Sequence, residues 1–102
     1  MNLFTKELIC EAIKSKRRLQ FTYRGRTRVV EPQIFGINTK GEDLLSAYFV
    51  SGYSESTRKP GWRSYLLSEL TDLAMLDDKF PGPREGYNPN DPHMTKIYCR
   101  LE

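Results

Sequence analysis

The sequence predicts a mainly β domain with an N-terminal helix, in which five short strands form a small closed or nearly closed barrel. Three observations predict this fold. An apolar stripe of helical period opens the chain, several short runs with the period of a strand follow it, and tight turns join most of those runs. Closure of the sheet removes exposed strand edges, which a sheet of this size could not otherwise protect.

The length and composition indicate one folded domain. The chain has 102 residues, of which 38% are hydrophobic and 28% are charged, a composition too apolar for a disordered chain. Its longest apolar stretch, Leu44–Val50, is much shorter than the roughly 20 residues that cross a bilayer. The first residues also lack the pattern of a signal peptide. We therefore expect a cytoplasmic protein that has no contact with a membrane.

The first element is a helix over residues 3–17. Its apolar residues recur at intervals of three and four, which places them on one face. These residues are Phe4, Leu8, Ile9, Ala12 and Ile13. The basic residues that crowd its last turns complement the negative end of the helix dipole, so they have a structural role without any ligand.

A strand begins directly after the helix. Its apolar face holds Leu19, Phe21 and Tyr23, and the residues between them are polar. The turn Arg24–Thr27 follows, and its Gly25 can adopt the positive φ that a tight turn requires. We expect one face of this strand to be buried.

The next two strands carry the middle of the sheet. The second runs over residues 28–37 and meets Pro32, which cannot donate to a ladder and so marks an edge, a bulge or a bend. The third, residues 43–51, has a mixed apolar run that indicates burial on both faces, and we expect it to be the central strand. The polar residues 52–61 predict a flexible connection.

The fourth and fifth strands are predicted at residues 62–70 and 73–76. A kink at Thr71 and Asp72 would separate them, and helical periodicity over residues 65–75 is a competing interpretation.

Prolines and glycines exclude regular structure over residues 81–92, where we expect an extended arm, and residues 94–101 could add a last strand. The predicted organisation is thus a barrel domain with its helix over residues 1–80, followed by a proline-rich arm and a possible terminal strand over residues 81–102.

The charged residues divide unevenly along the chain. Residues 1–40 carry nine basic and three acidic residues, a net charge of +6, whereas residues 41–102 carry seven basic and ten acidic residues, a net charge of −3. Such asymmetry is a sign of contact with nucleic acid, although a basic helix end is more often simply solvated.

The sequence shows no catalytic or metal-binding motif. Its single histidine, His93, lies in the proline-rich arm without a second histidine to complete a metal pair. Cys10 and Cys99 do not have the spacing of a zinc knuckle or a redox pair, and we expect free thiols, with a disulfide between the chain ends as the alternative. We therefore expect no enzyme, no cofactor and no bound metal.

Basic and aromatic residues remain as the candidate site. Strand parity puts Arg63 and Tyr65 on one otherwise apolar face, where an arginine needs an anionic or planar partner. The alternative for Arg63 is a solvent-reaching side chain or an internal ion pair with Glu31. Cations for phosphate and aromatic rings for bases are the components of single-strand binders. The candidate ligand-binding residues are Tyr23, Arg24, Arg26, Arg28, Arg63 and Tyr65.

Five runs, in this order, resemble the WYL domain of bacteria over about residues 8–80. They are Ala12-Ile13, Leu19-Gln20-Phe21-Thr22-Tyr23, Arg28-Val29-Val30-Glu31-Pro32, Leu44-Leu45-Ser46-Ala47-Tyr48 and Arg63-Ser64-Tyr65-Leu66-Leu67-Ser68-Glu69-Leu70, with a closing Phe80. The resemblance implies an Sm-like or SH3-like barrel, a role in transcription regulation or as a CRISPR accessory factor, and a basic and aromatic surface that senses nucleic acid or nucleotide-like ligands. Because no helix-turn-helix is visible, we expect a stand-alone module.

The chain departs from the family pattern at two kinds of position. Asp43-Leu44-Leu45 stands where the family has Trp-Tyr-Leu, and Leu66 and Glu69 stand where it has arginines. The loss of two cations weakens phosphate binding on that side, and the implied ligand contacts carry over best to Tyr23, Arg28 and Arg63.

Two hypotheses follow. The first is a module that binds single-stranded nucleic acid or a nucleotide-like anion. The second is a protein-interaction or homodimerisation module, in which Trp62, Leu66 and the strand over residues 94–101 cover the sheet edge of a partner.

Overall fold

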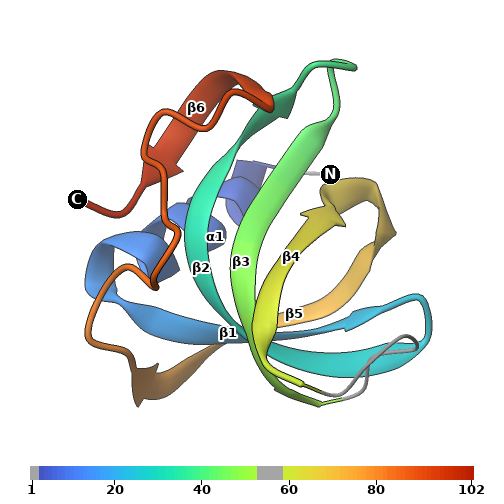
Figure 1. Cartoon of the computed structure of the whole chain (residues 1–102). Helices are drawn as coiled ribbons and strands as arrows, with labels where there is room; N and C mark the ends of the chain where they lie inside the picture. The colour runs from blue at the N-terminus through green and yellow to red at the C-terminus, as the bar shows by residue number, and fades with distance from the viewer. Residues whose placement is uncertain (1–2, 53–58) are drawn as a thin grey trace.

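The structure is a computed structural model that describes residues 3–52 and 59–102. One helix precedes six strands that wrap around an interior (Figure 1). The elements are α1 (Leu3–Ser15), β1 (Arg17–Tyr23), β2 (Arg26–Asn38), β3 (Asp43–Gly52), β4 (Gly61–Leu66), a 3₁₀ turn (Leu67–Glu69), β5 (Leu70–Lys79) and β6 (Met94–Arg100). The predicted mainly β class with an N-terminal helix is confirmed. The predicted connection over residues 52–61 falls largely outside the described residues.

The central strand is β2. The strands pair antiparallel in the order β4-β3-β2-β1-β5, and β6 also pairs with β2. With 13 residues, β2 is long enough to pair with β1 along its first part, with β6 along its last part and with β3 along nearly all of its length. The expectation that residues 43–51 form the central strand is therefore wrong, because β3 has only two neighbours. The ladder between β2 and β3 shifts between Pro32 and Ile34, as a proline in the strand predicts.

One face of each strand and one face of α1 form the core. Leu19, Phe21 and Tyr23 are buried, which confirms the predicted parity of β1. Ile9 and Ile13 of the helix are also buried, but Phe4 is 70% exposed and does not belong to the core stripe. The helix packs against the sheet through its later turns, so the side chain of Phe4 in its first turn does not reach the interior.

The helix ends two residues earlier than predicted. Lys16 adopts φ 56°, the left-handed conformation that stops a helix, and its N–H donates to the carbonyl of Ile13 at 3.2 Å. Strand β1 then begins at Arg17.

The fourth predicted strand is divided. Strand β4 stops at Leu66, and a 3₁₀ turn with a buried Leu67 leads into β5. Strand β5 is longer than predicted, because Asp72 at φ 53° bends the chain without ending the pairing with β1. The competing helical interpretation of residues 65–75 is wrong apart from this single turn.

Residues 81–93 contain no helix or strand, as predicted for residues 81–92, but they do not form an extended arm. Instead they return to the outer face of the sheet. The backbone N–H of Arg84 donates to the side-chain carbonyl of Gln33 at 3.3 Å, and the indole of Trp62 donates to the carbonyl of Glu85 at 2.9 Å. Tyr87 donates to the carbonyl of Leu101.

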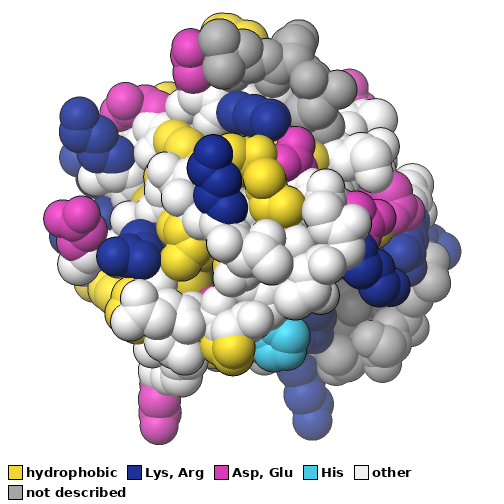
Figure 2. All heavy atoms as spheres, turned by 90° about the horizontal axis from the view of Figure 1, so that it is seen from above, with side chains coloured by type: hydrophobic (Ala, Val, Ile, Leu, Met, Phe, Trp, Pro, Cys, Tyr) yellow, Lys and Arg dark blue, Asp and Glu magenta, His cyan; other side chains and the backbone are white. Residues whose placement is uncertain are grey.

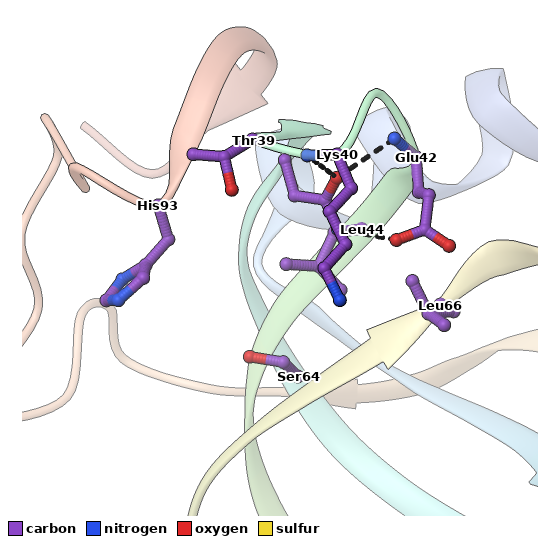
Figure 3. A pocket seen from close by; sticks show the side chains of 8 residues that line it. Thr39, Lys40, Glu42, Leu44, Ser64, Leu66 and His93 are labelled. Carbon is purple, nitrogen blue, oxygen red and sulfur yellow. Dashed lines mark hydrogen bonds between the residues drawn. The ribbon is translucent and has the colours of Figure 1, made fainter.

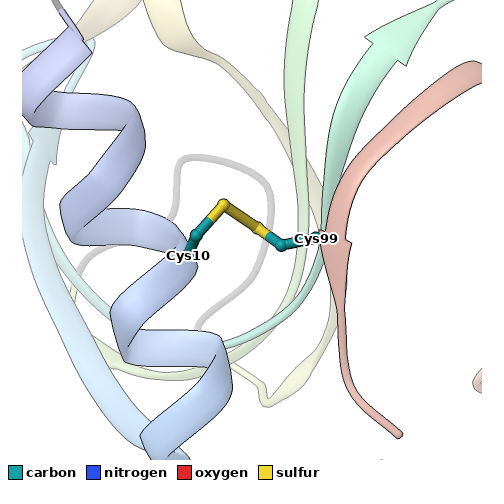
Figure 4. Close-up of a disulfide and its surroundings, with 2 residues drawn as sticks. All are labelled: Cys10 and Cys99. Atoms are coloured by element: carbon teal, nitrogen blue, oxygen red, sulfur yellow. A yellow bond between two sulfur atoms is a disulfide. The ribbon is translucent and has the colours of Figure 1, made fainter.

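Cys10 of α1 and Cys99 of β6 form a disulfide across 89 residues (Figure 4). The expectation of free thiols is wrong, because β6 pairs with the end of β2 that lies against the helix. The bond therefore joins the two ends of the described chain. Disulfides persist mainly in oxidising compartments, so this bond weighs against a location in a reducing cytosol.

Candidate functional site

Two of the predicted cations lie on the interior face of the sheet. Arg28 near the start of β2 pairs with the buried Phe21 of β1, and Arg63 near the start of β4 pairs with the buried Ala47 of β3. Residues directly opposite in a ladder share a face. Both strands begin at the same end of the sheet, where β3 finishes (Figure 1). The fold therefore brings these two cations to one end of the interior.

Arg28 is an enclosed cation. The residue is only 7% exposed. One of its guanidinium nitrogens donates to the backbone carbonyl of Tyr23 at 3.3 Å. The guanidinium carbon lies 5.2 Å from the ring centre of Tyr23 and 5.9 Å from that of Tyr65, within the range of cation–π attraction. Its Nε has no hydrogen-bond partner in the described part of the chain.

Tyr65 packs at the centre of this cluster. Its ring makes edge contacts with Phe21 and Tyr23 at centroid separations of 4.9 and 5.0 Å. It is 1% exposed, yet its hydroxyl has no hydrogen-bond partner among the described residues. Burial raises the pKa of the Tyr65 phenol above its ordinary value, although the Arg28 side chain, through its donor groups and its charge, and the charge of Arg63 act in the opposite direction. Both guanidinium groups are thus close enough to influence one hydroxyl.

Arg63 is half-buried at the edge of the same cluster. Its guanidinium lies 5.5 Å from the ring centre of Phe49 and donates to the carbonyls of Trp62 and Lys59 at 2.9 and 3.2 Å. These bonds use two of the five donors of an arginine. Over residues 3–52 and 59–102, neither Arg63 nor Arg28 has a carboxylate within ion-pair distance. Sequence reasoning missed Phe49, although its parity with Leu45 and Ala47 could have identified it.

Of the other three candidate residues, Tyr23 belongs to the same cluster, whereas Arg24 and Arg26 are exposed. The hydroxyl of Tyr23 accepts a hydrogen bond from the backbone N–H of Leu66 at 3.4 Å, so this phenol joins β1 to the end of β4. Arg24 is exposed, forms an ion pair with Glu69 at 3.1 Å and lies 5.2 Å from the Tyr23 ring centre. Arg26 is exposed on the turn side of β2. The structure therefore gathers Tyr23, Arg28, Arg63 and Tyr65, which we call the interior cluster.

Glu31 does not pair with Arg63. It is fully buried on the opposite face of β2, where Arg84 and Arg18 donate to its carboxylate at 2.7 and 3.0 Å. Strand parity explains the correction, since Glu31 lies three positions after Arg28 and an odd difference in position puts two residues on opposite faces of a strand. Burial alone would raise the pKa of the Glu31 carboxyl, but the hydrogen bonds and charges of Arg84 and Arg18 hold it below its ordinary value.

A concave surface lies at the opposite end of the sheet from the interior cluster. It is an open groove of about 390 Å³ between the turn after β2, the end of β4 and the residues before β6 (Figure 3). The Asn38 side chain in this groove already has partners, because its carbonyl oxygen accepts from the backbone N–H groups of Lys40 and Glu42 at 2.9 Å. Figure 2, which views this end of the molecule, shows basic and acidic side chains interspersed rather than one basic patch.

His93 has no partner that indicates catalysis. Its side chain is 85% exposed and lies 2.9 Å from the carboxylate of Asp91. Among the residues that the structure describes, no group of three or more potential metal ligands occurs, and no helix has the length and apolar composition of a membrane span.

Comparison with known proteins gives no relative. The chain matches no family model, and no curated protein or solved structure is significantly similar to it.

Proposed function

We propose that this protein is a WYL-like binding module, with an Sm-like or SH3-like barrel, that recognises single-stranded nucleic acid or a nucleotide-like anion through the interior cluster. One observation carries the proposal. Two guanidinium groups from strands that are not neighbours, on Arg28 and Arg63, occupy one interior face without a carboxylate partner in the described chain. A cation kept away from water without a counter-charge is costly, so an anionic ligand would stabilise this arrangement.

The aromatic residues supply the second part of the site. Tyr23 and Tyr65 lie against the Arg28 guanidinium and orient it, and Arg24 near the Tyr23 ring adds positive charge at the entrance. Arg26 contributes long-range attraction from the same turn. Such a combination of cations and aromatic rings favours a ligand that has both a phosphate and a base.

The experiment is a titration with a short labelled oligonucleotide at two salt concentrations. Binding that depends on phosphate weakens steeply as salt rises, because the release of counterions gains less entropy when the surrounding salt is already concentrated. The double variant Arg28→Ala with Arg63→Ala should abolish binding, and the matched control Arg17→Ala with Arg100→Ala should retain it, since both of these residues lie outside the interior cluster. Absence of binding even at low salt would reject the proposal.

The rival interaction module has less support. Its proposed surface is largely used within the chain, because Trp62 donates to the carbonyl of Glu85 and β6 pairs with β2. Light scattering of the intact chain tests it: a dimer would favour this alternative.

A further inference from the structure

The two cations of the interior cluster differ in their access to solvent. Arg63 is half-buried, whereas Arg28 is 7% exposed and Tyr65 beside it is 1% exposed. A ligand group that contacts Arg28 must therefore enter the interior of the sheet. This excludes a ligand that only passes over the surface.

Two buried polar atoms of the interior cluster have no hydrogen-bond partner among the described residues. They are the Nε of Arg28 and the hydroxyl of Tyr65, which have no hydrogen bond to any described residue. Buried donors in folded proteins are almost always paired, with protein, water or a ligand. The guanidinium carbon of Arg28 lies 5.9 Å from the Tyr65 ring centre, so the two side chains that carry these atoms are neighbours in the interior.

Phosphate groups differ in shape and charge. A phosphodiester inside a strand carries one negative charge and has the chain attached on both sides, so it needs an open track. A terminal phosphomonoester carries about −1.5 to −2 charges at neutral pH and has three acceptor oxygens on one side. The monoester can enter end-on, and its charge matches the two guanidinium groups.

We propose that the interior cluster recognises a terminal phosphomonoester, that of a nucleotide or of a strand end, rather than the phosphodiesters within a strand. This inference rests on the proposed function. Arg28 and Tyr65 then bind the inner oxygens, and Arg63 binds the oxygen nearest the entrance.

The test compares three probes in fluorescence-anisotropy titrations of the intact protein. The first two are one oligonucleotide sequence with a 5′-phosphate and with a 5′-hydroxyl, each labelled at its 3′ end, and the third is unlabelled adenosine 5′-monophosphate as a competitor. We expect the 5′-phosphate to improve affinity by at least about tenfold. The gain should shrink between pH 7.5 and pH 5.5, because the second pKa of a phosphomonoester is about 6.

Variants with matched controls assign the effect to the cluster. Tyr65→Phe removes a hydroxyl that has no protein partner, so the variant should fold normally and lose most of the preference for the 5′-phosphate. Tyr87→Phe removes a hydroxyl that donates to the carbonyl of Leu101 and should keep the preference. Arg28→Gln should also lose the preference for the 5′-phosphate, whereas Arg100→Gln should keep it.

The outcomes separate the inference from the proposed function. Equal, salt-dependent binding of the phosphorylated and unphosphorylated strands would overturn the inference and leave nucleic-acid binding intact. No binding of any probe at low salt would reject both. Competition by adenosine 5′-monophosphate at a concentration similar to that of the strand would identify the ligand as a free nucleotide, and much weaker competition would identify it as a strand end.

Discussion

The guanidinium of Arg84 donates to the buried carboxylate of Glu31 at 2.7 Å, across 53 residues of sequence. This contact fixes the returning segment over residues 81–93 on the outer face of β2. The Arg84 guanidinium also lies 4.4 Å from the ring centre of Tyr48, which adds a cation–π contact to the ion pair. Arg18 donates to Oε2 of the same carboxylate at 3.0 Å, an oxygen that also accepts a hydrogen bond from Arg84.

Replacement of this carboxylate should destabilise the protein. Loss of one partner of a buried ion pair costs about 3–5 kcal/mol, and we expect a value near the lower end for Glu31→Gln. The reason is that the side chains of Arg84 and Arg18 are 39% and 27% exposed and can regain contact with water. Urea unfolding gives the free energy of unfolding. The control Asp77→Asn changes a fully exposed carboxylate that pairs with Arg17 and should have no measurable effect, and an equal loss in both variants would contradict this account.

The Glu31 carboxylate should also make the free energy of unfolding depend on pH. Because the pKa of Glu31 lies below its ordinary value of 4.5, the ionised form stabilises the folded state above about pH 4.5. This contribution is lost as the pH falls from there through the lower pKa of the folded state. The difference in the free energy of unfolding between the native chain and Glu31→Gln should therefore be largest near pH 7 and shrink below pH 4.5. A difference that stays constant down to pH 2 would show that the pKa is not lowered.

Reduction of the disulfide should lower stability. The bond between Cys10 and Cys99 closes a loop of 89 residues, and loss of a native disulfide in a small domain costs about 2–5 kcal/mol. Urea unfolding with and without dithiothreitol measures the effect. The double variant Cys10→Ser with Cys99→Ser should match the reduced protein and not respond to the reductant; a native chain that does not respond either would mean that the bond does not form.

Gly36 should be essential for the attachment of β6. A Cβ at this position would collide with the backbone carbonyl oxygen of Lys96, which is too rigid to move aside. Gly36→Ala should therefore weaken the pairing of β6 with β2, and amide hydrogen exchange at Ile97 and Cys99 should accelerate. Gly41→Ala is the control, because no atom lies within 4 Å of its added Cβ. Its φ of +79° makes the substitution locally unfavourable, but exchange in β6 should be unchanged.

Local patterns predicted the parts of the fold that depend on near neighbours. Alternation placed Leu19, Phe21 and Tyr23 in the core, and the same parity put Arg63 and Tyr65 on one interior face. These assignments need only the two-residue period of a strand.

Features that depend on topology could not be predicted in the same way. The disulfide requires β6 to lie beside the end of β2, and the pairing of Glu31 with Arg84 requires residues 81–93 to return to the sheet. Both depend on contacts between distant segments. The 3₁₀ turn at Leu67–Glu69 was missed because an apolar run of this length fits a continuous strand equally well.

The most direct test of the interior cluster is NMR of the arginine side chains during titration with adenosine 5′-monophosphate. Each arginine gives one Nε–Hε signal, and the enclosed position of Arg28 protects its Nε–H from exchange with water. The account predicts that the Nε–Hε signals of Arg28 and Arg63 shift together and saturate at one ligand concentration, while that of Arg100 does not move. Saturable shifts confined to other arginines, with the signals of Arg28 and Arg63 unchanged, would contradict it.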